Sequence, residues 1–215
     1  SLLSFGQPEP PTDLQLEGLR VWLKENWHDG YHDGLGYNQA RMQMYGYIDN
    51  FDGLIECVYT RFTQDGGYVT YPNPINAEHI VPQSFFGGTE PMKSDIYILK
   101  PCHGNANSSR GNYPYGEVND AQAQWYGVID NTYISQGNMP SNHELWSERS
   151  KNIWEPREDQ KGNIARSIFY FYTMYPETVG DISQCGDPET LYQWHLNDPV
   201  DAEEQDRNDK IESQQ

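Results

Sequence analysis

The sequence predicts an α+β fold that is mostly helical and is built around a small antiparallel sheet. Three observations support this fold class. Amphipathic segments typical of helices lie near both ends of the chain. Two segments rich in β-branched and aromatic residues, typical of strands, lie between them. No internal repeat or clear linker interrupts the 215 residues, so we expect one domain over 1–215.

The N-terminal part, about 12–50, is expected to be helical. The segment TDLQLEGLRVWLKENW carries Thr12 and Gln15 at capping-box spacing, which predicts a helix start. One helical stripe then holds Leu16, Leu19, Leu23 and Trp27. A second helix is predicted over roughly 38–49, because four apolar residues recur there at helical spacing. These are Ala40, Met44, Tyr45 and Ile48.

The middle of the chain supplies the expected strands. LIECVYTRF at 54–62 and SDIYILKP at 94–101 have strand composition, and Pro101 is expected to end the second one. The turn residues 65–67 predict that YVTY at 68–71 resumes a strand. HGNANSSRGNYP, at 103–114, is rich in turn and cap formers, which indicates a loop that leads into a short helix.

The C-terminal part, about 150–200, is again expected to be helical. KGNIARSIFYFYTMY at 161–175 is strongly amphipathic, with Ile164, Ile168 and Phe171 on one face, and ETLYQWHLN at 189–197 is a second helix candidate. The segment before them reads as irregular. The acidic tail at about 198–215 is expected to be solvated or frayed.

Charge limits the partners that the chain can attract. Its formal charge is −18, the wrong sign for a protein held to nucleic acid by its overall field, and such an acidic balance usually serves solubility. The single basic island lies at 92–110, where Lys93, Lys100 and Arg110 outnumber Asp95. No apolar run approaches the roughly 18 residues of a membrane span, so no membrane partner is expected.

Cysteine usage leaves the redox compartment open. Cys57, Cys102 and Cys185 are too few and too scattered for a zinc pattern or a dense disulfide framework. One disulfide with one free thiol and three free thiols both fit the sequence.

One stretch places two chemically suitable side chains together, although the pair is weak evidence on its own. INAEHIVPQSFFGG, at 75–88, places Glu78 and His79 side by side, and at a strand end or bulge two neighbouring side chains can serve one site. A carboxylate suits Mg²⁺ or Mn²⁺, and a neutral imidazole suits a general base. The pair therefore fits metal-assisted hydrolysis, although an isolated Glu-His dipeptide is more often an exposed surface pair.

Two other groupings are weaker. His28 and His32 are four residues apart, but Gly30 between them favours a loop over a zinc-binding helix. Cys102 and His103 adjoin, yet a cysteine without a base placed beside it is usually a small apolar filler.

The elements that follow the Glu-His pair come in a distinctive order. Pro82-Gln83-Ser84, Ser94-Asp95, Pro101 and NANSSRGNYPYG succeed one another after residue 79. In this order the chain resembles the endonuclease I family of secreted bacterial nucleases, which belongs to the ββα-metal (His-Me finger) nucleases. The resemblance is close over 75–116 and looser over the C-terminal helices. It implies a ββα-metal core at about 54–116.

The resemblance also implies roles for four residues. His79 matches the general base, and Glu78 and Asn107 match the protein ligands of one divalent cation. We expect Mg²⁺, with Mn²⁺ or Ca²⁺ as alternatives. Arg110 matches a family arginine that we assign to a substrate phosphate. Lys93, Lys100, Arg110 and Arg61 are expected to form a local positive groove.

Departures from the family pattern leave alternatives open. Tyr97-Ile98 stands where the family commonly has histidine or asparagine, and Ser108 replaces a turn glycine. The expected function is a sequence-non-specific endonuclease for DNA, with RNA as second substrate, in a secreted monomer. A catalytically silent nuclease scaffold and an aromatic-rich carbohydrate- or surface-binding module are the competing interpretations.

Overall fold

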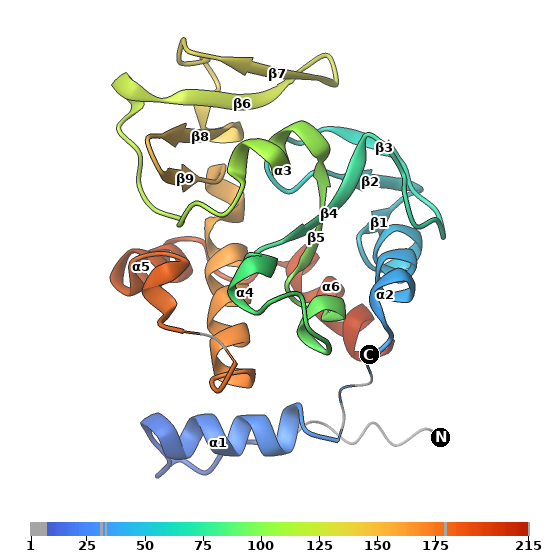
Figure 1. Cartoon of the computed structure of the whole chain (residues 1–215), viewed down its shortest axis with the longest axis vertical. Helices are drawn as coiled ribbons and strands as arrows, with labels where there is room; N and C mark the ends of the chain where they lie inside the picture. The colour runs from blue at the N-terminus through green and yellow to red at the C-terminus, as the bar shows by residue number, and fades with distance from the viewer. Residues whose placement is uncertain (1–7, 31, 33, 179, 215) are drawn as a thin grey trace.

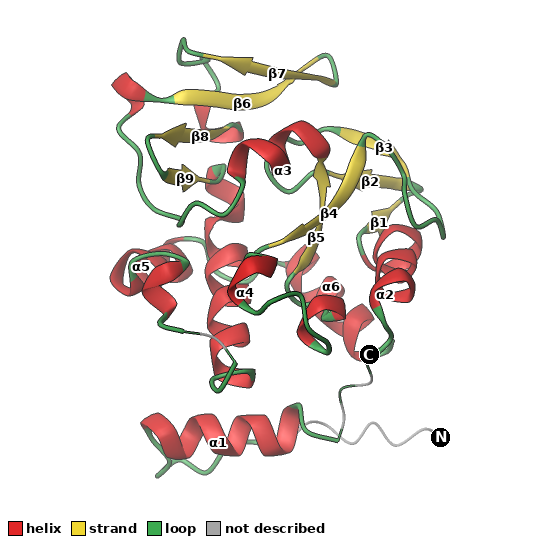
Figure 2. Cartoon of the chain, viewed as in Figure 1, coloured by secondary structure: helices red, strands yellow, loops and turns green. Residues whose placement is uncertain are grey.

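The computed structural model describes residues 8–30, 32, 34–178 and 180–214. Within these ranges it is an α+β structure, as predicted, with six α-helices and nine short strands (Figures 1 and 2). The helices are α1 (Leu16–Trp27), α2 (Tyr37–Gln43), α3 (Gly104–Arg110), α4 (Lys161–Met174), α5 (Pro188–Asn197) and α6 (Ala202–Glu212). The strands are β1 (Asn50–Phe51), β2 (Leu54–Glu56), β3 (Thr63–Asp65), β4 (Ile75–His79), β5 (Leu99–His103), β6 (Gln124–Ile129), β7 (Thr132–Gln136), β8 (Ser147–Ser150) and β9 (Ile153–Glu155).

The strands of the described residues form three separate antiparallel sheets. Their strand orders are β1-β2-β3, β4-β5 and β7-β6-β8-β9. In the central pair, Ile75 lies opposite His103 and His79 lies opposite Leu99. Helix α3 begins directly after β5 and lies beside the pair (Figure 1). Two strands and a helix thus follow one another at the centre of the molecule.

The second predicted strand is displaced. β5 covers 99–103 instead of 94–101, and Pro101 lies in its middle opposite Ala77. A proline lacks the backbone N–H that pairs with a neighbouring strand, which is why the sequence predicts a strand end at Pro101. The structure tolerates it because the pair has only two strands, and the Pro101 carbonyl accepts a 2.9 Å hydrogen bond from the Val58 N–H outside the pair.

The N-terminal helices agree only in part with the sequence pattern. The second predicted helix is confirmed as α2 and a π-helical turn, η1 (Met44–Ile48), and its four apolar residues are all buried. Helix α1 exists, but none of its residues is buried, and Leu16 is 89% exposed. Gln15 is its N-cap without a side-chain cap bond. The apolar stripe of α1 therefore does not belong to the core, apart from Leu23, which packs at its edge.

In two further stretches the strands differ from those that the sequence predicts. The segment before residue 150, expected to be irregular, contains most of the four-stranded sheet β7-β6-β8-β9. Conversely, 68–71 forms no strand and is a loop that exposes Tyr68 and Tyr71. The tight hairpin between β6 and β7 turns at Asp130 and Asn131, which both have positive φ, as a two-residue hairpin requires.

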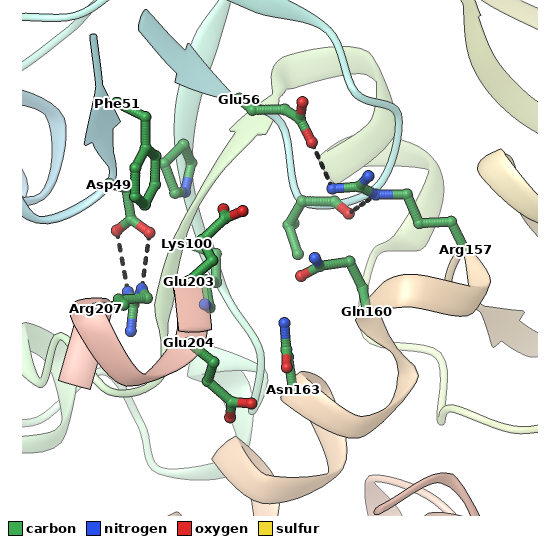
Figure 3. A pocket seen from close by; sticks show the side chains of 12 residues that line it. Asp49, Phe51, Glu56, Lys100, Arg157, Gln160, Asn163, Glu203, Glu204 and Arg207 are labelled. Atoms are coloured by element: carbon green, nitrogen blue, oxygen red, sulfur yellow. Dashed lines mark hydrogen bonds and ion pairs between the residues drawn. The ribbon is translucent and has the colours of Figure 1, made fainter. Parts of the chain in front are cut away.

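The acidic tail is also corrected. Residues 202–212 form α6, which Asp201 caps by accepting the Glu204 N–H. Arg207 is buried and forms a bidentate ion pair with Asp49, at 2.7 and 3.0 Å (Figure 3). It also donates to the carbonyls of Ile96 and Leu99. Arg207 therefore ties this mostly acidic helix to the start of β5, and Glu204 of the same helix pairs with Arg166 of α4.

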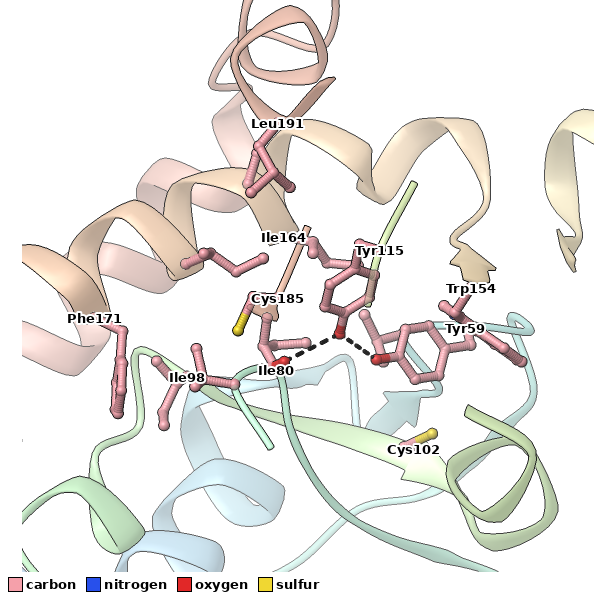
Figure 4. Packing of buried hydrophobic residues seen from close by; sticks show 14 of the residues in the cluster. Tyr59, Ile80, Ile98, Cys102, Tyr115, Trp154, Ile164, Phe171, Cys185 and Leu191 are labelled. Carbon is pink, nitrogen blue, oxygen red and sulfur yellow. Dashed lines mark hydrogen bonds between the residues drawn. The ribbon is translucent and has the colours of Figure 1, made fainter. Parts of the chain in front are cut away.

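The largest apolar cluster lies between the central strand pair and α4 (Figure 4). Helix α4 contributes the predicted face, with Ile164, Ile168 and Phe171 fully buried. All three cysteines are buried and free, and the Sγ atoms of Cys57 and Cys102 are 3.8 Å apart. Among the described residues, no helix is long and apolar enough to cross a membrane.

Candidate active site

The end of β4 and the helix α3 line one pocket of about 310 Å³. Glu78, His79, Asn107 and Arg110, the four residues singled out in the sequence, all border it. The strand pair explains this: β5 returns antiparallel to β4, and α3 starts at the next residue, so a helix about thirty positions later reaches the Glu-His pair. The sequence neighbours are thus joined by an amide and a guanidinium from α3.

Glu78 is buried and held by two side chains. The Tyr59 hydroxyl donates a 2.8 Å hydrogen bond to its Oε1, and the Arg110 Nη1 lies 3.3 Å from the same oxygen. Burial raises the pKa of Glu78 to about 7, while the Arg110 charge and the Tyr59 hydrogen bond oppose this rise. Both contacts fall on Oε1. The carboxylate is therefore oriented by its surroundings, with Oε2 outside this pairing.

His79 is held in one tautomer by the backbone. Its Nε2 lies 3.0 Å from the Lys93 carbonyl oxygen, which can only accept, so Nε2 carries the proton and Nδ1 keeps its lone pair. Tyr37 stacks on the imidazole with ring centroids 5.7 Å apart, and Phe86 lies 6.0 Å away. Burial lowers the pKa of His79 to about 4, so the ring is neutral at physiological pH. A neutral, oriented imidazole is suited to accept a proton.

Asn107 is oriented through its amide nitrogen. Nδ2 donates to the Asn76 Oδ1 at 3.0 Å and to the Ala77 carbonyl at 3.2 Å, and both acceptors belong to β4. These bonds fix the amide plane and use the nitrogen, so the carbonyl oxygen is the atom left to serve a ligand. Asn76, which flanks the Glu-His pair in sequence, thereby positions the side chain of α3.

Arg110 is 1% exposed and has partners within the protein. Its Nη2 donates to the Ile80 carbonyl at 2.7 Å, and its guanidinium lies over the Tyr115 ring at 4.5 Å. Together with the approach to Glu78, these contacts tie α3 to the end of β4. These contacts of Arg110 are all intramolecular. Its contact with a substrate phosphate, implied by the resemblance, stays a prediction.

The expected positive groove is corrected for two of its four residues. Lys100 lines a different pocket of about 50 Å³, together with Arg157, Glu203 and Glu204 (Figure 3). Arg61 pairs with Asp159 at 2.6 Å. Lys93 does lie near His79, with its Nζ 5.0 Å from the centroid of the Tyr37 ring.

Two tyrosines that contact the Glu-His pair have no role in the sequence analysis. Tyr59 lies there within a predicted strand, and Tyr37 lies just before the second predicted helix. Figure 4 shows the Tyr59 hydroxyl joined to that of Tyr115, at 2.7 Å, and Tyr115 joined to the Ile80 carbonyl. No local sequence pattern marks Tyr59 or Tyr37, because each reaches the Glu-His pair only through the tertiary structure.

A second group of ligand-type side chains lies elsewhere. Ligand atoms of His28, His32 and Asp95 lie within 4.8 Å of one another, and Gly30 lies in a turn after α1, as the sequence predicts. The polar atoms of this group also serve a hydrogen-bond network. Tyr175 donates to Asp95 at 2.7 Å, and its oxygen lies 3.0 Å from the His28 Nε2. The group could hold a metal ion if this network rearranged.

The pocket at β4 and α3 has the donors that a hard divalent cation prefers. Carboxylate and amide oxygens suit Mg²⁺, Mn²⁺ and Ca²⁺, and two protein ligands leave room for water and substrate. Glu78 and Asn107, from β4 and α3, supply such oxygens and line the same pocket. The residues present therefore fit a bound cation.

Comparison with known proteins decides the family. The model of the family described as Endonuclease I matches residues 24–215, nearly the whole chain. The chain belongs to the endonuclease I family. The match contains every residue that lines the pocket, Tyr37 included, and also Tyr59, which donates to Glu78. Together with the group of His28, His32 and Asp95, it also suggests a metal cofactor.

Individual relatives are 28–31% identical to the chain over part of its length. It is 29% identical over 151 residues to an extracellular ribonuclease of Bacillus subtilis (strain 168), covering 63% of this chain and 46% of that protein. A ribonuclease of the same name from Bacillus amyloliquefaciens is 28% identical over the same extent. Endonuclease-1 of Buchnera aphidicola is 31% identical over 84 residues, 39% of this chain and 28% of that protein. The chain thus spans less than half the length of the curated relatives it matches.

Proposed function

We propose that this protein is a divalent-metal-dependent endonuclease that hydrolyses phosphodiester bonds of DNA and RNA without sequence preference. We further propose that β4, β5 and α3 form a ββα-metal motif. The observation that carries this proposal is the pocket in which a backbone-held neutral His79 adjoins the oxygens of Glu78 and Asn107. The products would carry 5′-phosphate and 3′-hydroxyl ends.

His79 is the proposed general base. The Lys93 carbonyl holds the Nε2 proton, so Nδ1 accepts the proton of the attacking water. The low pKa keeps that atom unprotonated at neutral pH, and Tyr37 and Phe86 restrict the ring. General-base catalysis of this kind contributes roughly 10²–10⁴-fold to a rate.

Glu78 and Asn107 are the proposed cation ligands. A divalent cation bound there supplies positive charge to the phosphate and to the departing 3′ oxygen. Arg110 and Tyr59 orient the Glu78 carboxylate for this task through its Oε1. In the proposed arrangement, any contact of Arg110 with a substrate phosphate adds to this positioning role.

The substrate and the location are proposed from the relatives. Two relatives are named extracellular ribonucleases and one is named Endonuclease-1, so RNA and DNA are both proposed substrates. The word extracellular in two of these names supports secretion, and we propose that the protein acts outside the cytoplasm as a monomer. Most of the Trp and Tyr side chains that suggested a carbohydrate-binding module are buried or packed against the apolar clusters, and that interpretation does not account for the pocket.

The decisive experiment is digestion of plasmid DNA and of a structureless RNA with Mg²⁺, with EDTA, and with the His79→Ala variant. We expect cleavage with Mg²⁺, none with EDTA, and a fall in kcat of roughly 10²–10⁴-fold for His79→Ala, because the base is lost while the ligands stay. Time courses on gels and circular dichroism of each variant provide the measurements.

His143→Ala is the matched control, since His143 is an exposed histidine outside the pocket. It should cleave like the parent. A folded His79→Ala variant with full activity would refute the assignment of the base. A parent protein that cuts neither nucleic acid at any Mg²⁺ concentration would instead support the catalytically silent scaffold.

A further inference from the structure

A column of stacked side chains leads from His79 to the protein surface. The Tyr37 ring stacks on the imidazole, and the Arg41 guanidinium lies over the Tyr37 ring at 4.4 Å. The Tyr71 ring then covers the same guanidinium at 4.3 Å. The column therefore reads His79, Tyr37, Arg41, Tyr71, and its inner end lines the pocket of the proposed active site.

Its outer end is unusually exposed. Tyr71 is 76% exposed, while Arg41 beneath it is 4% exposed, so the tyrosine contributes little to the core. Tyr71 belongs to the 68–71 loop, and the Tyr68 ring of this loop packs closely against the backbone of Gly46. The packing is so close that a Cβ added at Gly46 would lie 2.6 Å from the ring. The ring is thus presented to solvent by an anchored loop. Neither the fold nor the proposed chemistry uses its exposed surface.

The chemistry of such a ring favours one ligand. Exposed aromatic rings bind unpaired nucleobases by stacking, and a guanidinium held against the opposite face adds positive charge beneath the stack. Lys93, whose Nζ lies 5.0 Å from the Tyr37 centroid, adds a cation on the route to His79. A strand that follows the column places a base on Tyr71 and its phosphates near Lys93. In a molecule of net charge −18, these local contacts matter more than the overall field.

We propose that Tyr71, supported by Arg41, is a base-stacking subsite for an unpaired nucleotide of the strand that carries the reacting phosphate. This rests on the proposed nuclease function and adds a preference to it. A paired base is stacked on its neighbours and cannot cover the ring, so the subsite favours single-stranded over double-stranded nucleic acid.

The test separates binding from cleavage by using the His79→Ala protein as parent. Fluorescence anisotropy measures the Kd of a labelled oligothymidylate and of a DNA duplex of equal length, with Mg²⁺ present, for the parent and for the parent carrying Tyr71→Ala. We expect Tyr71→Ala to raise the Kd for the single strand about 5- to 100-fold over that of the parent. The Kd for the duplex should not change. Tyr71→Trp should keep single-strand binding, because it retains a stacking ring.

Tyr192→Ala is the matched control, since Tyr192 is a 48% exposed tyrosine on α5 outside the pocket, and it should change neither Kd. Equal single-strand affinity with and without the Tyr71 ring would overturn the subsite, as would an equal loss for the duplex. If the His79-containing enzyme still cleaves in either case, the nuclease proposal stands without the subsite. If the His79-containing protein does not cleave but Tyr71→Ala selectively weakens single-strand binding, the nuclease proposal is wrong and the stacking subsite stands.

Discussion

Tyr59 shows how a single hydroxyl can orient a buried carboxylate, that of the proposed cation ligand Glu78. The hydroxyl donates to the Glu78 Oε1 and contacts the Tyr115 hydroxyl at 2.7 Å, and Tyr115 in turn reaches the Ile80 carbonyl. Burial alone would favour the protonated carboxyl, since a charge is costly in an apolar interior. A hydroxyl donor and the Arg110 guanidinium oppose that cost and fix the orientation of the group.

Tyr59→Phe removes this hydroxyl while keeping the ring. Because residues that orient a metal ligand typically affect metal affinity about 10- to 100-fold, we expect the Mg²⁺ concentration for half-maximal activity to rise by about that factor. The rate at saturating Mg²⁺ should change less. A metal titration of the initial cleavage rate measures both quantities.

Tyr45→Phe is the control for this prediction. Its hydroxyl is also buried but has no hydrogen-bond partner among the described residues, so removing it should leave the Mg²⁺ requirement unchanged. The positioning role of Tyr59 would be contradicted if the two variants showed the same Mg²⁺ dependence as the parent.

Helix α6 illustrates how an element with little apolar surface is attached to the fold. Its apolar contribution to the core is Ile211. Arg207 supplies a polar attachment to Asp49 and to two carbonyls, and Glu204 pairs with Arg166 of α4 at 2.5 Å. Asp49 directly follows the π-helical turn after α2, the helix that carries Tyr37. Through one guanidinium, α6 links the segment that covers His79 to the start of β5.

Arg207→Ala leaves the Asp49 carboxylate buried without its partner. Loss of one member of a buried ion pair typically costs about 3–5 kcal/mol, so we expect the free energy of unfolding to fall by about that amount. Urea denaturation followed by tryptophan fluorescence is the measurement. A loss below about 1 kcal/mol would show that α6 is held by other contacts.

Asp206→Ala is the comparison on the same helix. Asp206 pairs with Lys210 at 2.8 Å, and its side chain is 53% exposed. An exposed pair of this kind is worth up to about 1 kcal/mol, so this variant should remain close to the parent in the same denaturation experiment.

At the scale of the whole molecule, excess negative charge extends into the interior. Glu148 and Glu155 lie directly opposite each other on β8 and β9, and both are buried. Lys161 pairs with Glu155 at 2.7 Å, whereas the Glu148 Oε2 has no hydrogen-bond partner in the part of the chain that the structure describes. Burial first, and the Glu155 charge second, raise the pKa of Glu148 to about 8.

This arrangement predicts that stability depends on pH. The folded pKa of Glu148 lies above its unfolded value, so the folded protein binds the proton more tightly and loses stability as pH rises from about 4.5 through 8. Glu148→Gln removes the charge at every pH. We therefore expect it to raise the free energy of unfolding by about 1–3 kcal/mol at pH 8.5 and by much less at pH 5.

Denaturation curves at the two pH values test this, with Glu144→Gln as the control. Glu144 is exposed, and its replacement should change stability by less than about 0.5 kcal/mol at either pH. If Glu148→Gln destabilised the protein at pH 8.5, the carboxylate would be contributing favourably and the argument would be wrong.

Much of this fold was predictable where the pattern is local. The face of α4 and the second helical segment repeat apolar residues at helical spacing, and both are buried as expected. The sheet β6–β9 and helix α6 were not predicted. Short strands gain their stability from partners distant in sequence, and α6 depends on an arginine whose partner lies at residue 49.

The sequence by itself determined the chemistry of the pocket: an adjacent carboxylate and imidazole, and an amide with an arginine three residues further along. Only the tertiary structure decided which atoms are free to act. The Lys93 carbonyl selects the His79 tautomer, β4 occupies the Asn107 nitrogen, and Arg110 turns to Glu78 in the interior. The physical reason is that tautomer, orientation and pKa depend on neighbours brought together by strand pairing, and no local pattern encodes those neighbours.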